Sequence, residues 1–131
     1  MNEVKVAMLG FGGIAKSHKH AYEQLEAAGE PIRLVAICDV DETRFTSGTA
    51  TNLGVEKAAN LEGIHTYTDV DEMLRNEEID MVDICIPSYL HKEYAVKIMK
   101  AGKDVLSEKP MALTSADCEE MLQTARACGR R

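Results

Sequence analysis

Apolar and polar positions along the chain repeat with two alternating periods. Short runs rich in Val and Ile are followed by longer stretches in which apolar residues recur every three or four positions. These are the spacings of buried strands and of amphipathic helices. Strands are predicted at residues 4–9, 32–38, 64–67, 81–86 and 104–107. A helix is predicted after each strand, although Thr residues weaken the helical pattern over 41–53.

The first predicted helix has the clearest amphipathic pattern. It follows the first strand directly and is expected to end at Gly29, with Pro31 just beyond. Its apolar stripe is predicted to consist of Ile14, His18, Ala21, Tyr22 and Leu25. On that stripe His18 is interpreted as a packed histidine.

The order of elements predicts the fold class. Parallel strands that are joined by helices must wind right-handedly, and the sheet needs cover on both faces. We therefore predict an α/β fold with a doubly wound parallel sheet of the Rossmann type, in one domain over residues 1–131. A complete dinucleotide-binding domain usually has six strands, whereas this chain has five predicted strands.

The amino-acid composition argues against nucleic-acid and membrane partners. The 131 residues include 22 acidic residues against 15 Lys and Arg, a net charge of −7, which opposes binding to nucleic acid or to anionic lipid. The apolar runs are far shorter than the ~20 residues of a membrane span, and the first residues do not resemble a secretory signal. We expect a cytoplasmic protein with no nucleic-acid or membrane partner. The four cysteines match neither a disulfide framework nor a metal site, so we expect reduced thiols and no bound metal.

A glycine-rich turn provides the first candidate site. Gly10, Gly12 and Ala15 form a G-x-G-x-x-A pattern between the first strand and the first helix, the context in which this pattern binds dinucleotides. Gly10 permits a tight turn, Gly12 lets the backbone approach a pyrophosphate, and the small Ala15 allows close packing of helix on strand. Free amides at the start of the helix would bind the phosphates.

An acidic residue after the second strand supports this interpretation. Asp39 lies 24 residues beyond Ala15, close to the roughly 20 expected for a carboxylate that binds a ribose diol. Such a carboxylate repels a 2′-phosphate and favours NAD, whereas the nearby Arg44 could accept that phosphate, so NADP stays open. Taken alone, the same features also fit a generic strand-to-helix turn or the cofactor site of a methyltransferase.

The second half of the chain is more specific. Residues 80–112 strongly resemble the Gfo/Idh/MocA family of NAD(P)-dependent oxidoreductases, and the blocks GFGGIAKSH and ICDVDETR extend the match over nearly the whole chain. The signature is Glu108-Lys109-Pro110 after the fifth strand, together with the turn from Pro87 to His91.

The resemblance implies an activity and a role for Lys109. In that family this lysine projects towards the nicotinamide and the substrate, where a cation stabilises a developing alkoxide and relays the hydroxyl proton. The implied reaction is hydride transfer between nicotinamide and a carbinol carbon of a sugar, an inositol or a related polyol. Glu108 is expected to lie against the cofactor or to orient Lys109.

The resemblance also implies that the chain is incomplete. Family members continue into a second α/β domain with the substrate pocket, so this chain corresponds to the N-terminal cofactor-binding domain, and the full-length protein is expected to be a homo-oligomer. An alternative is a nucleotide-binding or sensing module without turnover. The predicted catalytic residue is Lys109. The predicted cofactor-binding residues are Gly10, Phe11, Gly12, Gly13, Ile14, Asp39, Pro87, Ser88, His91, Glu108 and Lys109.

Overall fold

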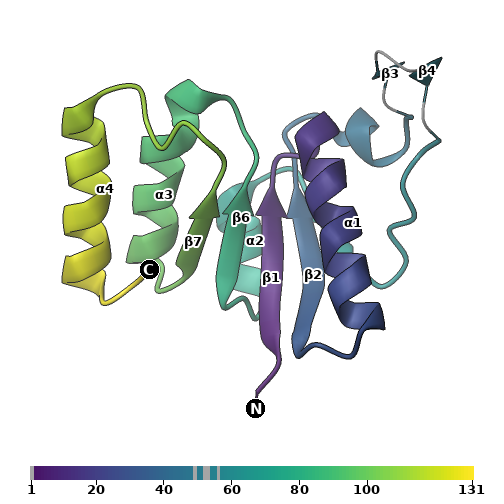
Figure 1. Ribbon diagram of the computed structural model, residues 1–131, viewed down its shortest axis with the longest axis horizontal. Helices are drawn as coiled ribbons and strands as arrows, with labels where there is room; N and C mark the ends of the chain where they lie inside the picture. Colours follow the sequence, from purple (N-terminus) through teal and green to yellow (C-terminus); the bar gives the residue numbers. More distant parts are fainter. Residues whose placement is uncertain (1, 49, 52–53, 56) are drawn as a thin grey trace.

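The computed structural model describes residues 2–48, 50–51, 54–55 and 57–131. Figure 1 shows one parallel sheet with helices on both faces. Its five strands are β1 (Val4–Leu9), β2 (Ile32–Cys38), β5 (His65–Tyr67), β6 (Met81–Ile84) and β7 (Asp104–Ser107). The helices are α1 (Gly13–Ala27), α2 (Val70–Asn76), α3 (His91–Lys100) and α4 (Ser115–Cys128). The predicted fold class is confirmed.

The strand order is β5-β2-β1-β6-β7, and every pair is parallel. The chain builds outward from β1 in one direction and then returns to add β6 and β7 on its other side (Figure 1). The change of direction lies between β1 and β6. In open parallel sheets, ligands bind beside the carboxyl ends of the strands at such a point.

The two faces of the central strand supply two hydrophobic clusters. Val6 and Met8 pack with α1, whereas Ala7 and Leu9 pack with residues of α2 and α3. All four are buried, as expected for a strand covered on both faces. In Figure 1, α4 lies against α3 at the outer side of the sheet.

The predicted buried stripe of α1 is partly wrong. Ile14 and Leu25 are 51% and 40% exposed, and the buried positions are Ala15, Lys19 and Tyr22. The helix is turned so that the small Ala15, with no exposed surface, faces the sheet. Lys19 buries its aliphatic stem and pairs its ammonium with Glu23.

The predicted helix over 41–53 is also wrong. The chain instead forms a short 3₁₀ turn, η1 (Glu42–Phe45), and then a small hairpin of β3 (Ala50–Thr51) and β4 (Gly54–Val55), while residues 49, 52 and 53 lie outside the described part. Asp41 accepts hydrogen bonds from the amide and hydroxyl of Thr43, and the hydroxyl of Ser47 donates a hydrogen bond to the Thr43 carbonyl. These local bonds compete with helical ones.

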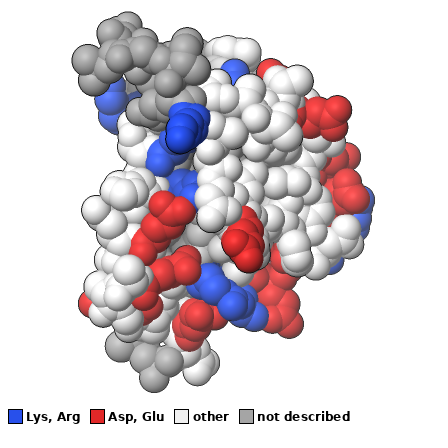
Figure 2. Space-filling view, turned by 90° about the vertical axis from the view of Figure 1, so that its right-hand side faces the viewer, with Lys and Arg blue, Asp and Glu red and all other residues white. Residues whose placement is uncertain are grey.

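The ends of α2 and α4 carry the capping residues that their sequences predict. Asp69 caps α2 and Thr114 caps α4, and α4 ends at the left-handed Gly129. No helix in the described residues is long and apolar enough to cross a bilayer. Figure 2 shows the side of the molecule that lies at the right of Figure 1, where acidic and basic side chains are interspersed.

Candidate functional site

The turn after β1 is shaped by a close approach of two strand ends. Gly10 has φ +92°, and a Cβ at this position would lie 2.4 Å from the carbonyl oxygen of Cys85 at the end of β6. A positive φ disfavours other residues, and the backbone contact excludes a side chain independently. Gly10 therefore allows β1 and β6 to end side by side.

A buried carboxylate fastens this turn to the neighbouring strand. Asp39 Oδ2 accepts a hydrogen bond of 2.8 Å from the Phe11 amide, and Oδ1 accepts one of 2.9 Å from the Asp41 amide. The Arg44 Nε lies 3.7 Å from Oδ2. Asp39 is buried, and its bond to the Phe11 amide holds the glycine turn against the end of β2.

A cleft of about 260 Å³ opens at the switch point between β1 and β6. It contains four of the predicted residues, Gly10, Gly12, Asp39 and Pro87. Arg44, which the sequence suggested as a partner for a 2′-phosphate, also lines it. The remaining lining residues were not predicted, and they are Leu9, Cys38, Val40, Cys85, Ile86, Tyr89, Leu90 and Tyr94. Apolar walls with a few polar groups are typical of ligand sites.

The start of α1 forms the polar floor of this region. Gly12 is the N-cap and makes no side-chain cap bond, so the first amides of the helix remain available to an anion. A Cβ on Gly12 would lie 2.9 Å from Arg44 Nη1, so the missing side chain leaves room beside the guanidinium. Gly13 and Ile14 are exposed beside this turn, whereas the ring of Phe11 is buried beneath it.

His91 has a different place from the one expected. It is 1% exposed, and its ring nitrogens lie 2.7 Å from the Pro110 carbonyl and 2.8 Å from the Ile86 carbonyl. This burial removes it from the wall of the cleft. His91 instead ties the turn after β6 to the loop after β7. Ser88, at the start of the short turn η2 (Ser88–Leu90), is half-buried.

The loop after β7 carries the Glu108-Lys109-Pro110 signature. The Lys109–Pro110 peptide bond is cis. Glu108 is half-buried, while Lys109 is exposed. The Glu108 amide donates to the Ile84 carbonyl at 3.1 Å, and Glu108 Oε2 accepts from the Lys109 amide at 3.3 Å. The backbone of this loop is therefore anchored to the end of β6.

The structure adds a side-chain network that the sequence analysis did not find. His18 Nδ1 lies 2.7 Å from Asp83 Oδ2, and His18 Nε2 lies 2.6 Å from Glu108 Oε1. The Tyr22 hydroxyl donates to the same Asp83 oxygen at 2.8 Å. Asp83 has no exposed surface. A charged residue inside an otherwise apolar strand was the available signal, since such a residue needs a partner.

The surroundings shift the pKa values of this network. Burial would lower the pKa of His18, but hydrogen bonds and charge from Asp83 and Glu108 outweigh it, so the pKa is raised. Burial, followed by the charge of Asp83, raises the pKa values of Tyr22 and of Cys85. Burial also raises the pKa of Cys38 to about 12. These thiols are poor nucleophiles because only the thiolate reacts readily.

His18, Asp83 and Cys85 could in principle approach one metal ion, because their donor atoms lie within 4.8 Å of one another. Hydrogen bonds already join these groups, including a contact of 3.5 Å between Cys85 Sγ and Asp83 Oδ1. The raised pKa of Cys85 also disfavours the thiolate that metals prefer. The geometry therefore fits a hydrogen-bond network better than a metal centre.

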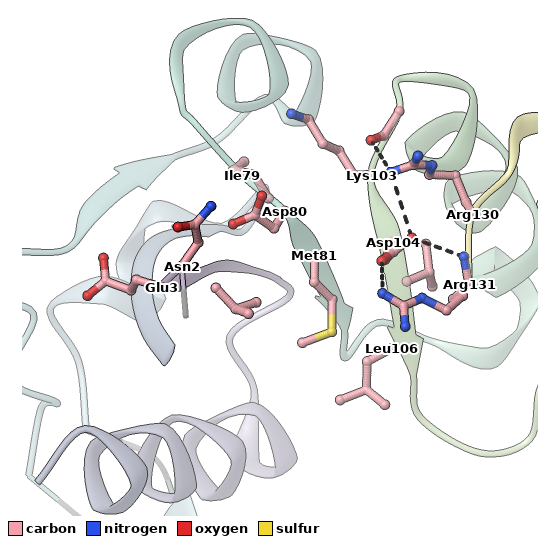
Figure 3. A pocket seen from close by; sticks show the side chains of 13 residues that line it. Asn2, Glu3, Ile79, Asp80, Met81, Lys103, Asp104, Leu106, Arg130 and Arg131 are labelled. Atoms are coloured by element: carbon pink, nitrogen blue, oxygen red, sulfur yellow. Dashed lines mark hydrogen bonds and ion pairs between the residues drawn. The ribbon is translucent and has the colours of Figure 1, made fainter. Parts of the chain in front are cut away.

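A larger hollow lies at the opposite edge of the sheet (Figure 3). It measures about 680 Å³ and is lined by the amino-terminal ends of β1, β6 and β7. Asp104 in its wall accepts hydrogen bonds from the amide and side chain of Arg131. The glycine turn and the signature loop are both at the other edge. We therefore assign the site to the cleft beside the glycine turn and the signature loop, where the strand order changes direction between β1 and β6, although that cleft is the smaller one.

Comparisons with known proteins identify the family of this chain. An oxidoreductase family with an NAD-binding Rossmann fold, GFO_IDH_MocA, matches residues 4–131. Scyllo-inositol 2-dehydrogenase (NADP(+)) of Bacillus subtilis is 38% identical over 99 residues, which are 73% of this chain and 30% of that protein. Myo-inositol 2-dehydrogenase of Thermotoga maritima is 32% identical over 94% of this chain and 33% of its own length.

A solved structure shows the same fold. The WlbA dehydrogenase of Bordetella pertussis, crystallised with NADH and UDP-GlcNAcA, matches with a TM-score of 0.81 and 28% identity. The match covers 99% of this chain and 36% of that one. The chain thus spans about a third of the length of these relatives.

Gly10→Ala tests the close approach of β1 and β6. We expect it to lower the free energy of unfolding by roughly 2–5 kcal/mol, from the positive φ and the backbone clash together. Gly29→Ala is the matched control, because Gly29 has φ +81° but open space around its Cβ position. It should cost only about 1–2 kcal/mol. Equal losses in urea denaturation would show that the contact with Cys85 is unimportant.

Proposed function

Because this chain belongs to the Gfo/Idh/MocA oxidoreductase family, which has an NAD-binding Rossmann fold, we propose that residues 1–131 are the cofactor-binding domain of a two-domain NAD(P)-dependent dehydrogenase. The observation that carries the proposal is the anchored glycine turn. Asp39 holds the Phe11 amide while the start of α1 stays uncapped beside it. This is the arrangement that a dinucleotide requires.

The residues present fit a dinucleotide. The diphosphate would bind the amides of Gly12, Gly13 and Ile14, because the α1 terminus has no side-chain cap and a Cβ at Gly12 would crowd Arg44. The edge of the Asp39 carboxylate would receive the adenosine ribose. Arg44, next to Asp39, would face a 2′-phosphate if NADP were bound.

The nicotinamide half would extend past β6. Pro87 lines the same cleft, and Ser88 begins the turn that follows. Glu108 and Lys109 lie in the loop beyond the neighbouring strand β7. When bound, the nicotinamide would supply the acceptor for the hydride of a carbinol carbon.

Lys109 is proposed as the catalytic residue. Its neutral amine would accept the proton of the substrate hydroxyl as the hydride leaves the carbinol carbon, and the ammonium formed would stabilise the oxygen on which negative charge develops. Glu108 bonds the Lys109 amide and thereby orients the base of this side chain. A polyol such as an inositol is the proposed substrate class, since two relatives are named inositol 2-dehydrogenases.

The share of the relatives that this chain covers supports a second domain with the substrate pocket. We also propose that the full-length protein is a cytoplasmic homo-oligomer. The alternative of a nucleotide-binding module without turnover predicts NADH binding but no polyol oxidation. Spectrophotometric assay of NAD reduction by scyllo- and myo-inositol, with the protein expressed from its whole gene, separates the two.

Titration with NADH and NADPH, followed by nucleotide fluorescence, tests cofactor binding directly. We expect saturable binding of NADH. Arg44→Ala should weaken NADPH binding by roughly tenfold or more, because a charge-assisted hydrogen bond to a phosphate contributes about 1.5–3 kcal/mol. NADH affinity should change by less than about threefold. If neither nucleotide binds the unmodified protein, the proposed function is wrong.

Lys109→Ala tests the catalytic role. In the whole enzyme, kcat should fall by roughly 10²- to 10⁴-fold, the usual contribution of acid–base catalysis. The Kd for NADH should stay nearly unchanged. Lys103→Ala is the control, because Lys103 lines the hollow at the other edge of the sheet and should leave kcat unaltered. A Lys109→Ala enzyme with normal kcat would remove Lys109 from the mechanism.

A further inference from the structure

We propose that His18 is a positioning residue for the signature loop: as an imidazolium between Asp83 and Glu108, it holds Glu108 in place, and loss of its proton at alkaline pH releases that side chain. The inference rests on the proposed function for its effect on catalysis. Its structural part, a histidine whose two ring nitrogens both face carboxylates, does not depend on the proposed function.

Both nitrogens of the His18 ring face carboxylate oxygens. The distances are 2.7 Å from Nδ1 to Asp83 Oδ2 and 2.6 Å from Nε2 to Glu108 Oε1. A neutral imidazole has one N–H and one bare nitrogen, so one of the two contacts would set a lone pair against a carboxylate. The imidazolium donates to both oxygens, and charge-assisted bonds have these short distances.

The buried carboxylate supplies the main reason for the charge. Asp83 is fully buried in the central sheet, where an unpaired charge is very costly. Its other contacts are the Tyr22 hydroxyl and the Cys85 thiol, which are neutral donors. The nearby Lys19 is paired with Glu23. Among the contacts of Asp83 in the described residues, only His18 can supply a compensating positive charge.

The hydrogen bonds of His18 and Glu108 help to fix the position of the Lys109 backbone. On one side, His18 holds the Glu108 side chain. On the other, His91 bonds the Pro110 carbonyl. Lys109 lies between these two held residues and is itself exposed. Because Glu108 also accepts from the Lys109 amide, releasing Glu108 would loosen the backbone from which the catalytic amine extends. A shift of about 1 Å in a catalytic group can cost on the order of 10²-fold in rate.

The groups around His18 determine the direction of the pH effect. Asp83 faces it from β6 and Cys85 from the residue just after β6. Glu108 faces it from the loop after β7, and Tyr22 of its own helix is linked to it through Asp83. Burial opposes the charged ring, but the two carboxylates outweigh burial and raise the pKa of His18. Tyr22 and Cys85 also have raised pKa values, so they stay neutral while His18 titrates.

The sign of the stability effect follows. A histidine whose pKa is higher in the folded state stabilises the fold fully below its unfolded value of about 6.5. That contribution is lost as pH rises through the folded value. We call the link from Asp83 through the His18 imidazolium to Glu108 the clamp. It should therefore be complete in mildly acidic solution and absent in alkaline solution.

The first test is an NMR pH titration of the histidine ring nitrogens of the protein. His18 should carry protons on both nitrogens at pH 6.5 and titrate above the ordinary histidine value of about 6.5. His20 lies on the same helix and is 69% exposed at its side chain. His18→Gln should lower Tm most at acidic pH, with a difference that shrinks as pH rises. His20→Gln is the matched control and should show no such trend. A His18 that is neutral at pH 6.5 would overturn the proposal.

The second test measures catalysis in the whole enzyme. His18→Gln should reduce kcat by roughly 10- to 100-fold, with a Kd for NADH within about threefold of the unmodified value, and should remove the alkaline decline of kcat that deprotonation of His18 causes. His18→Lys keeps a positive charge at higher pH, so it should recover part of kcat and extend activity to more alkaline solution. A pH profile unchanged in His18→Gln would refute a role in positioning.

These tests separate the clamp from the proposed function. If the protein neither binds NADH nor oxidises a polyol, the proposed function fails while the NMR titration still decides the charge of His18. If it is an active dehydrogenase but His18 is neutral at pH 6.5, the clamp fails and the function stands. Because the titration uses the unmodified chain, it does not depend on whether any variant folds.

Discussion

The close approach of β1 and β6 at their carboxyl ends is the constraint on which the site depends. The strands can end side by side because residue 10 has no side chain to meet the Cys85 carbonyl. The chain then turns directly into α1, so the uncapped helix start, the end of β2 and the turn after β6 meet around one cleft. A side chain at position 10 would push these elements apart and separate the groups that a dinucleotide contacts together.

Two buried carboxylates then hold the loops around that cleft. Asp39 accepts amide hydrogens from the glycine turn and from the chain beyond β2, while Asp83 bonds Tyr22 and His18 from α1. They differ in how their charge is compensated. Asp39 bonds backbone amides near an exposed guanidinium, whereas Asp83 is enclosed and needs a charged donor. For this reason we infer a titratable clamp only on the Asp83 side.

Volume and chemistry point to different places in this molecule. The lining of the hollow of about 680 Å³ at the amino-terminal edge includes no residue of the turn from Gly10 to Gly13 or of α1, while the cleft of about 260 Å³ has the turn and the helix start beside it. An α/β sheet concentrates backbone amides and short loops at the carboxyl ends of its strands. The smaller cleft is therefore the better candidate for the site of a chain whose family has an NAD-binding Rossmann fold.

The sequence by itself determined the five strands, the parallel sheet, the glycine turn, Asp39 and the family signature, because each of these is encoded in residues close together along the chain. The 3₁₀ turn after Asp41 escaped prediction, because local Thr and Ser bonds replaced the helical ones. Only the tertiary structure decided the rotation of α1, the burial of His91 and the meeting of His18, Asp83 and Glu108. Asp83 and Glu108 lie 65 and 90 positions beyond His18 along the chain. Strand order and helix packing bring them together, and no short-range periodicity records those long-range contacts.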